Sequence, residues 1–336
     1  MSIFRRTKLS DRQNKAVERS LSQIRQQRRS RFRVLACVDE TDESLNAVRM
    51  AARLAPDETC DIIVVFVRPI DQGLPSGGLQ MKLARQNILQ AGFDLAGISR
   101  LKQALAILEE EGLDCVNWPS EASHEEAWDA AGDNKVEYKS PDGRSVVLKL
   151  KTAPDIASGI LDQYELGPYN LIVMGEPSSW RDAFRKYLFG SGIVQQVVML
   201  APCSVLVARD SLDKSGFLIC TDGTSRSMQA VRRSAVLAQI TGQAITLFSA
   251  AENEASLAVA QENVENAKAL LKAMGIAKTE TRVGIGKPAD AIVAAGEDYA
   301  VIVVTDEGRS GWQRLWRGSV AYDVVRRAKT SVLDVR

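Results

Sequence analysis

The sequence predicts two α/β domains in tandem, each a doubly wound parallel sheet with helices on both faces. Residues 34–55 and 217–238 share eleven of twenty-two positions at a constant offset of 183, so the 336-residue chain contains an internal duplication. The apolar runs at 62–67, 171–174 and 301–304 lack the alternation of a half-exposed strand. Such runs indicate strands that are buried on both faces, as in a parallel sheet.

The second copy, residues 214–336, shows the element order most clearly. Pro288 is expected at the first position of a helix, because its fixed φ and missing N–H suit that position. Apolar patterning and turn residues predict strands at 217–221, 244–249, 279–284, 300–304 and 331–335, and further helices at 225–240, 254–274 and 319–328.

The first copy, residues 32–210, follows the same order but carries an insertion at about 119–152. Its third strand is expected near residues 115–118. Within the insertion, residues 135–151 hold a Ser-Pro-Asp-Gly turn between two alternating segments, which predicts a β-hairpin on the surface.

Residues 1–31 form a basic tail with a predicted helix. Residues 1–33 contain eleven Lys or Arg against two acidic residues, a net charge of +9, while the rest of the chain carries −8. A capping box at Ser10 and an apolar stripe at Val17, Leu21 and Ile24 favour a helix. Residues 5–33 can contact an anionic lipid, nucleic acid or protein surface, or pack on the acidic body; both interpretations stay open.

Metal and thiol chemistry are not expected. The cysteines form no Cys-x-x-Cys pair, and most lie in or beside apolar runs, so we expect buried, reduced thiols in a cytoplasmic protein. The single histidine, His124, has no Cys or His at ligand spacing, and most His-based triads are excluded. We therefore predict no metal site, no catalytic residues and no conventional enzyme.

Two loops in each copy are expected at the carboxyl ends of the strands, where open parallel sheets bind ligands. Asp39-Glu40-Thr41 and Asp222-Gly223-Thr224 follow the first strands. An Asp at this place can bind ribose hydroxyls, or it can take part in a helix N-cap; the residues favour neither.

The loop after the fourth strand of the second copy has features of an anion site. Glycine lets backbone N–H groups approach phosphate, and Gly318-Ser319 opens a helix whose free N–H groups favour anions. Arg309, between Gly308 and Gly318, adds positive charge.

Together these features resemble the universal stress protein family, in its tandem two-domain form, over nearly all of residues 32–336. Members with bound ATP carry Gly-x2-Gly-x9-Gly-Ser/Thr after the fourth strand and an Asp after the first. The resemblance implies the adenine nucleotide alpha hydrolase-like fold and ATP or AMP binding, with Mg²⁺ accompanying ATP. Thr305 stands where the first motif glycine is expected. The implied binding residues of the second domain are Asp222, Gly223, Thr224, Ala250, Gly308, Arg309, Gly318 and Ser319.

The first domain departs further from that pattern. Ser178 replaces the middle glycine, and Gly190 comes fifteen residues after Gly175, against thirteen from Thr305 to Gly318. We therefore expect the second domain to be the better nucleotide site. The weaker site of the first domain comprises Asp39, Thr41, Val67, Gly175, Gly190 and Ser191.

The leading hypothesis is a stress-response regulator that binds an adenine nucleotide and switches or scaffolds a protein partner. The alternative is a nucleotide-independent tandem scaffold that recruits partners through the basic tail or the hairpin. Edge strands at 204–207 and 331–335 are expected to pair the two domains as a pseudo-dimer, and a homodimer of the whole chain stays open.

Overall fold

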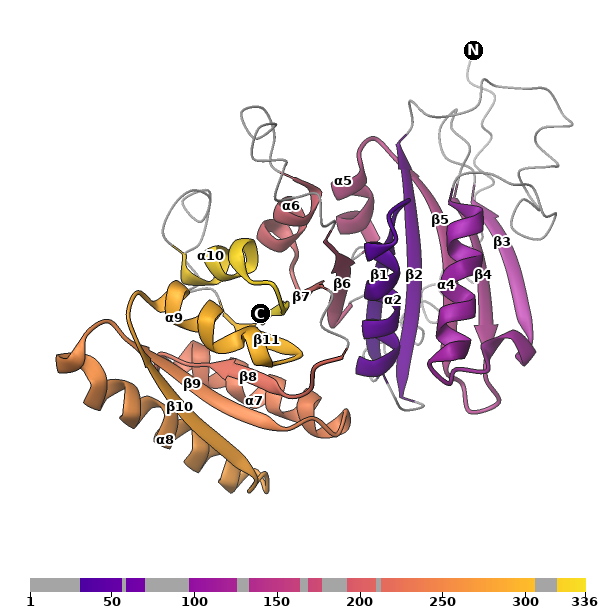
Figure 1. Ribbon diagram of the computed structural model, residues 1–336. Helices are drawn as coiled ribbons and strands as arrows, with labels where there is room; N and C mark the ends of the chain where they lie inside the picture. Colours follow the sequence, from indigo (N-terminus) through magenta and orange to yellow (C-terminus); the bar gives the residue numbers. More distant parts are fainter. Residues whose placement is uncertain are drawn as a thin grey trace, which may run out of the picture.

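The computed structural model describes residues 31–55, 59–69, 97–125, 133–163, 169–176, 192–209, 213–305 and 319–336. Within these ranges the strands form one continuous sheet (Figure 1). In spatial order its strands are β10 (Thr279–Ile285), β9 (Ile245–Ala251), β8 (Phe217–Cys220), β11 (Val301–Val304), β12 (Ser331–Asp334), β7 (Ser204–Ala208), β6 (Leu171–Gly175), β1 (Phe32–Val38), β2 (Cys60–Pro69), β5 (Ser145–Ala153), β4 (Asp133–Lys139) and β3 (Ser120–Glu125).

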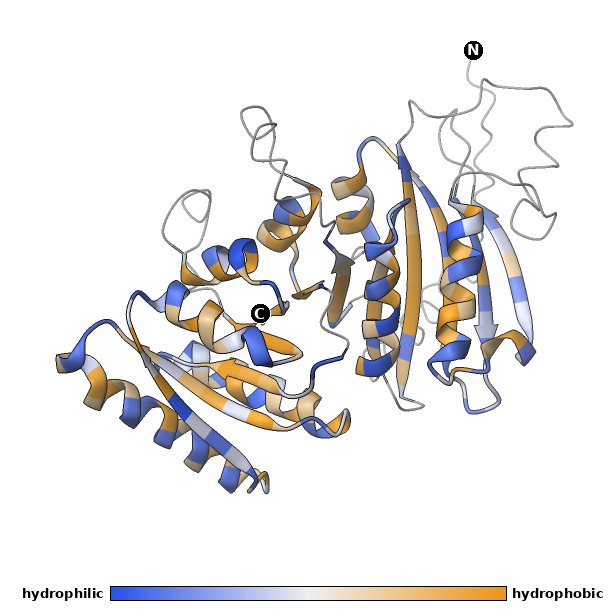
Figure 2. Cartoon of the chain, viewed as in Figure 1, coloured by the Kyte–Doolittle hydropathy of each residue, from blue (hydrophilic) through white to orange (hydrophobic). Residues whose placement is uncertain are grey.

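Helices cover both faces of this sheet, which confirms the doubly wound prediction. One hydrophobic core lies under α2 (Glu43–Leu54), α4 (Ile98–Glu110), α7 (Ser225–Ile240) and α8 (Leu257–Ala273). The other lies under α5 (Ile156–Leu161), α6 (Ile193–Leu200), α9 (Pro288–Ala295) and α10 (Val320–Arg327). Successive residues of β1 from Val34 to Val38 enter opposite cores, so this part of the strand is apolar on both faces, and Figure 2 shows mostly apolar residues along β2 as well. No helix in the described ranges is long and apolar enough to cross a bilayer.

Each domain has the same strand order. The parallel sets are β5-β2-β1-β6-β7 and β10-β9-β8-β11-β12, so strand order reverses between the first and fourth strands of each copy. Helices α4 and α8 end alike, at the left-handed glycines Gly112 (φ +92°) and Gly275 (φ +86°). The duplication in sequence is therefore a duplication of topology.

The predicted third strand of the first domain was wrong. Residues Cys115–Asn117 form a 3₁₀ helix, and β5 pairs parallel with β2 in the place of a third strand. The hairpin at 135–151 is confirmed as antiparallel β4 and β5, but it is not a surface addition. Val146, Leu148 and Leu150 of β5 are buried in the core beside α4, so this arm belongs to the sheet, and β3 and β4 are the strands that extend it.

The domains join edge to edge, as expected for a pseudo-dimer. Strand β7 pairs antiparallel with β12, with Val207 opposite Val332 and Val205 opposite Asp334. This pairing gives each edge strand a hydrogen-bonded neighbour and makes one sheet of two domains.

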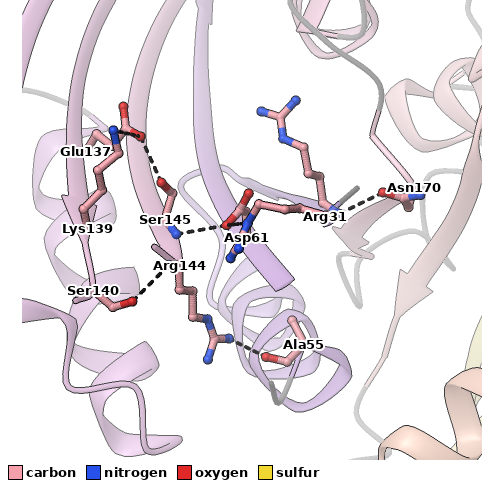
Figure 3. Close-up of polar contacts among 10 residues, drawn as sticks. Arg31, Ala55, Asp61, Glu137, Lys139, Ser140, Arg144, Ser145 and Asn170 are labelled. Atoms are coloured by element: carbon pink, nitrogen blue, oxygen red, sulfur yellow. Dashed lines mark hydrogen bonds and ion pairs between the residues drawn. The ribbon is translucent and has the colours of Figure 1, made fainter. Parts of the chain in front are cut away.

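A polar network fixes the amino end of the first domain's sheet (Figure 3). Arg31 Nε and Ser145 N both donate to Asp61 Oδ1, at 2.8 and 2.9 Å, and Ser145 Oγ donates to Glu137 Oε1 at 2.9 Å. Arg33 N donates to Asn170 Oδ1 at 2.8 Å. These contacts place Arg31 at the end of the sheet opposite the strands' carboxyl ends. The predicted tail helix lies outside the described residues.

All five cysteines are free and buried, as the sequence predicted. Burial raises the pKa of Cys37 and of Cys220, and it raises the pKa of Cys115 and of Cys203 to about 11. Because the thiolate is the reactive form, we expect a thiol reagent at about pH 8 to label the native protein at least about tenfold more slowly than the urea-unfolded protein. Mass spectrometry of timed samples measures both rates. Rapid labelling of the native protein at Cys37 or Cys220 would contradict the burial described here.

Candidate functional site

The carboxyl ends of β9, β8 and β11 bring three loop starts of the second domain together. Asp222 follows β8, Ala250 lies near the end of β9, and Thr305 follows β11 directly. Because β9-β8-β11 are neighbours and parallel, these residues share one edge of the sheet, at the reversal of strand order.

The first loop of this domain is an ordered helix cap. Asp222 Oδ1 accepts from Thr224 N at 3.0 Å and from Thr224 Oγ1 at 2.7 Å, and Thr224 caps α7 by accepting from Ser227 N at 3.2 Å. Partial desolvation opposes the charge of Asp222, but hydrogen bonds with Ser227 and Thr224 outweigh it and lower the pKa of that carboxyl group. Asp222 is therefore ionised at neutral pH, and it lies exposed at the strand end.

Gly223 lies against a residue that the sequence did not indicate. Its φ is +79°, and a Cβ built on it would lie 2.1 Å from Asn263 Oδ1 of α8. The same amide donates from Nδ2 to Ser249 Oγ at 3.4 Å. The positive φ favours glycine here, and a side chain would also displace the Asn263 amide. Asn263 is one of several polar residues on α8, and no local pattern distinguishes it from the others.

The start of α10 has the predicted cap. Ser319 is its N-cap residue, and its Oγ accepts from Tyr322 N at 3.4 Å. Thr305, in the place of the family's first motif glycine, donates from Oγ1 to Val335 O at 2.9 Å. Gly308, Arg309 and Gly318 lie outside the described residues, so their role in an anion site stays a prediction.

The first domain repeats the Asp–Thr hydrogen bonds but not the helix cap, since α2 has no side-chain cap at its N-cap residue Asp42. Asp39 Oδ1 accepts from Thr41 N at 2.8 Å and from Thr41 Oγ1 at 2.5 Å. Arg100 of α4 donates to Asp42 Oδ1 at 3.0 Å and to Glu40 O. Arg100 lies as many residues before Gly112 as Asn263 lies before Gly275, so the two residues occupy equivalent positions on α4 and α8. At this position the first domain has an arginine that hydrogen-bonds the loop, and the second domain has an amide.

Two further positions of the first domain are tightly packed. Val67 is only 6% exposed, and a Cβ on Gly159 of α5 would lie 2.4 Å from Val67 Cγ1. A Cβ on Gly175 would lie 2.4 Å from Glu43 O, at the first turn of α2. Gly190 and Ser191 lie outside the described residues.

The comparison with known proteins matches this two-domain arrangement. A model of the universal stress protein family matches residues 31–209 and again residues 217–336. The chain belongs to the universal stress protein family. No curated protein sequence matches it.

Two solved universal stress proteins share the fold over most of the chain, and a third is similar in sequence to part of it. A universal stress protein from Archaeoglobus fulgidus DSM 4304 is 15% identical, with a TM-score of 0.57 over 90% of this chain and 98% of its own. A putative universal stress protein from Pseudomonas aeruginosa UCBPP-PA14 is 14% identical, with a TM-score of 0.56 over 92% of this chain and 94% of its own. A universal stress protein in complex with cAMP is 30% identical and covers 37% of this chain and 97% of its own, with a TM-score of 0.32.

Proposed function

We propose that the second domain binds an adenine nucleotide, ATP or AMP, and that binding switches or scaffolds a protein partner in a stress response. The observation that carries the proposal is Asp222. It is an ionised, exposed carboxylate held by Thr224 at the reversal of strand order, beside the end of β11. A fixed carboxylate there can accept hydrogen bonds from ribose hydroxyls, and the N-terminus of α10 favours phosphate.

The residue after the second strand also favours the second domain. Ala250 is partly exposed, so its backbone can meet an adenine ring. Val67, the corresponding residue of the first domain, is buried beneath α5. An adenine ring at that place would have to displace packed apolar side chains, which costs free energy.

The residues at the ends of the fourth strands also favour the second domain as the nucleotide site. In the first domain, β6 and α2 meet so closely at Gly175 that no Cβ fits between them. In the second, Thr305 carries a side chain that turns toward Val335 of the last strand. The close contact of Gly175 with α2 in the first domain is therefore not repeated at Thr305 in the second.

Magnesium is proposed only as a companion of ATP. The described residues contain no group of three His, Cys, Asp or Glu side chains that could hold a metal ion. Asp222 is one carboxylate, and Mg²⁺ commonly combines one or two carboxylates with phosphate oxygens and water. Among the described residues, Asp222 therefore fits an ion that arrives with the triphosphate.

We propose binding without conventional catalysis. His124 lies on β3 in the first domain, where its Nδ1 is 2.9 Å from Asn134 Oδ1. Cys37 and Cys220 lie at the ends of β1 and β8, but burial raises the pKa of both thiols, which disfavours the nucleophilic thiolate.

Matched Asp→Ala variants test the site. Asp222→Ala and Asp39→Ala remove the same Asp–Thr hydrogen bonds in the two domains, so their stabilities should fall by similar amounts, about 1 kcal/mol. We expect Asp222→Ala to weaken nucleotide binding about tenfold or more, because a hydrogen bond to a charged group is lost, and Asp39→Ala to leave binding unchanged. Equilibrium dialysis with labelled ATP, AMP and cAMP measures the affinity.

The same experiment separates the two hypotheses for the chain. Saturable binding of one nucleotide per chain that depends on Asp222 supports the proposed site. Equal losses in both variants would place the ligand elsewhere. No saturable binding by the unmodified protein would favour the nucleotide-independent scaffold, with recruitment through residues 5–33 or the β4–β5 hairpin.

A further inference from the structure

The seam between the domains is the place where β7 pairs with β12. Two arginines cross it in a reciprocal arrangement. Arg209 follows β7 of the first domain, and its backbone N donates to Ser331 Oγ of the second at 3.0 Å. Arg336 follows β12 of the second domain, and its backbone N donates to Ser204 Oγ of the first at 3.2 Å. Each side chain therefore enters the other domain from an equivalent place.

The side chain of Arg209 holds the end of α10. Its Nη1 donates to Thr330 O at 3.1 Å, and its Nη2 donates to Val325 O in the last turn of the helix. The guanidinium is buried, and a cation at the carboxyl end of a helix satisfies carbonyl groups and opposes the helix dipole. A residue of the first domain thus fixes a helix of the second.

The other end of α10 belongs to the proposed nucleotide site. The helix has eight residues, so it is about 12 Å long, and it begins at the Ser319 cap. In a helix of this length, loosening the carboxyl end at Val325 would shift the N–H groups at its start.

Arg209 also contacts the exit of the fourth strand in its own domain. It forms an ion pair with Glu176, the residue after Gly175, and both side chains are 9% exposed. On the other side, Arg336 donates to Val198 O and Ala201 O at the end of α6.

The second domain's fourth strand reaches the same seam. Val335, the residue before Arg336, accepts from Thr305 Oγ1 and donates to Val304 O at 2.9 Å. The fourth-strand exit of the first domain therefore contacts Arg209, and that of the second contacts the residue before Arg336.

We propose that Arg209 is a positioning residue for the nucleotide site of the second domain, acting through α10, so that the seam couples the two domains. This inference rests on the proposed nucleotide site. The coupling is reciprocal in free energy: a nucleotide that binds at the start of α10 strengthens the hold of Arg209 on its end.

Arg209→Gln is the direct test, and Leu101→Ala is its matched control. Leu101 is a buried residue of α4 in the first domain, so its truncation lowers stability without touching the seam. We expect Arg209→Gln to weaken nucleotide binding about tenfold, within the usual range of coupling between sites, and Leu101→Ala to leave it unchanged. Titration calorimetry well below the unfolding temperature measures the affinities.

Hydrogen–deuterium exchange supplies a second measurement that needs no nucleotide. Exchange should accelerate over residues 320–327 in Arg209→Gln and stay unchanged there in Leu101→Ala. Arg209→Lys, which keeps the charge but loses the planar fork, should give an intermediate result and serves if Arg209→Gln does not fold.

The outcomes separate this inference from the proposed function. If the unmodified protein binds no nucleotide, the proposed function fails, while exchange in α10 still decides whether Arg209 holds the helix. Equal affinity in Arg209→Gln or Arg209→Lys and the unmodified protein, or unchanged exchange over 320–327, would overturn the positioning role.

Discussion

Gly175→Ala is expected to destabilise the protein by about 3 kcal/mol, at the upper end of the usual cost of overpacking. The new Cβ would lie 2.4 Å from Glu43 O and 2.6 Å from Ser44 Cα. Both are backbone atoms of α2, so no side chain can turn aside, and β6 or α2 must move. Urea unfolding followed by circular dichroism measures the loss.

Two variants separate this clash from the ordinary effects of the substitution. Gly112→Ala places a Cβ where nothing lies within 4 Å, so only its φ of +92° opposes the change, and we expect a loss of about 1 kcal/mol. Thr305→Ala, at the corresponding place in the second domain, removes the hydrogen bond to Val335 O and should cost about 1 kcal/mol. If Gly175→Ala were as stable as Gly112→Ala, the close contact of β6 with α2 would not matter to stability.

Most of the fold could be predicted from the sequence because the same pattern of apolar and polar residues occurs in both halves of the chain. The duplicated segment fixed the start of each domain, and unalternating apolar runs identified strands buried on both faces. The pairing of the two domains could be predicted from the last strands. Within their own domains β7 and β12 have one neighbour each, so each has a free edge that can pair with the other.

The third strand of the first domain was misplaced for a physical reason. Strand β5 packs Leu148 and Leu150 under α4 but carries charge on its other face, where Lys149 Nζ lies 3.2 Å from Asp133 Oδ2. This alternation is typical of a half-exposed hairpin. The parallel pairing with β2 depends on a long-range register that no local pattern encodes.

Local parts of the candidate site could be predicted, and long-range contacts could not. The caps formed by Asp222 with Thr224 and by Ser319 involve neighbours in sequence. Asn263 and Arg209 act on residues far away along the chain, and their positions follow only from the packed fold. The glycines and Arg309 of the predicted phosphate loop stay predictions.

The second large effect is expected at the buried ion pair of the seam. Glu176→Ala takes away the carboxylate beside the Arg209 guanidinium, and both side chains are 9% exposed. Breaking a buried pair from one side typically costs about 3–5 kcal/mol, because the remaining charge stays desolvated. Urea unfolding measures the loss, and Asp323→Ala is the control. Asp323 pairs with Arg326 at 3.6 Å with both side chains about two-fifths exposed, so its loss should stay within about 0.5 kcal/mol.

A double variant, Glu176→Leu with Arg209→Met, decides what the pair contributes. Apolar residues of similar size often replace a buried ion pair without loss, so the double variant should recover most of the stability that Glu176→Ala loses. It still lacks the donors that hold Val325 O and Thr330 O, so exchange over residues 320–327 should remain fast. Recovered stability with a loosened α10 would mean that the pair serves the placement of the helix more than the strength of the fold. Failure to recover stability would mean that the charges themselves hold the domains together.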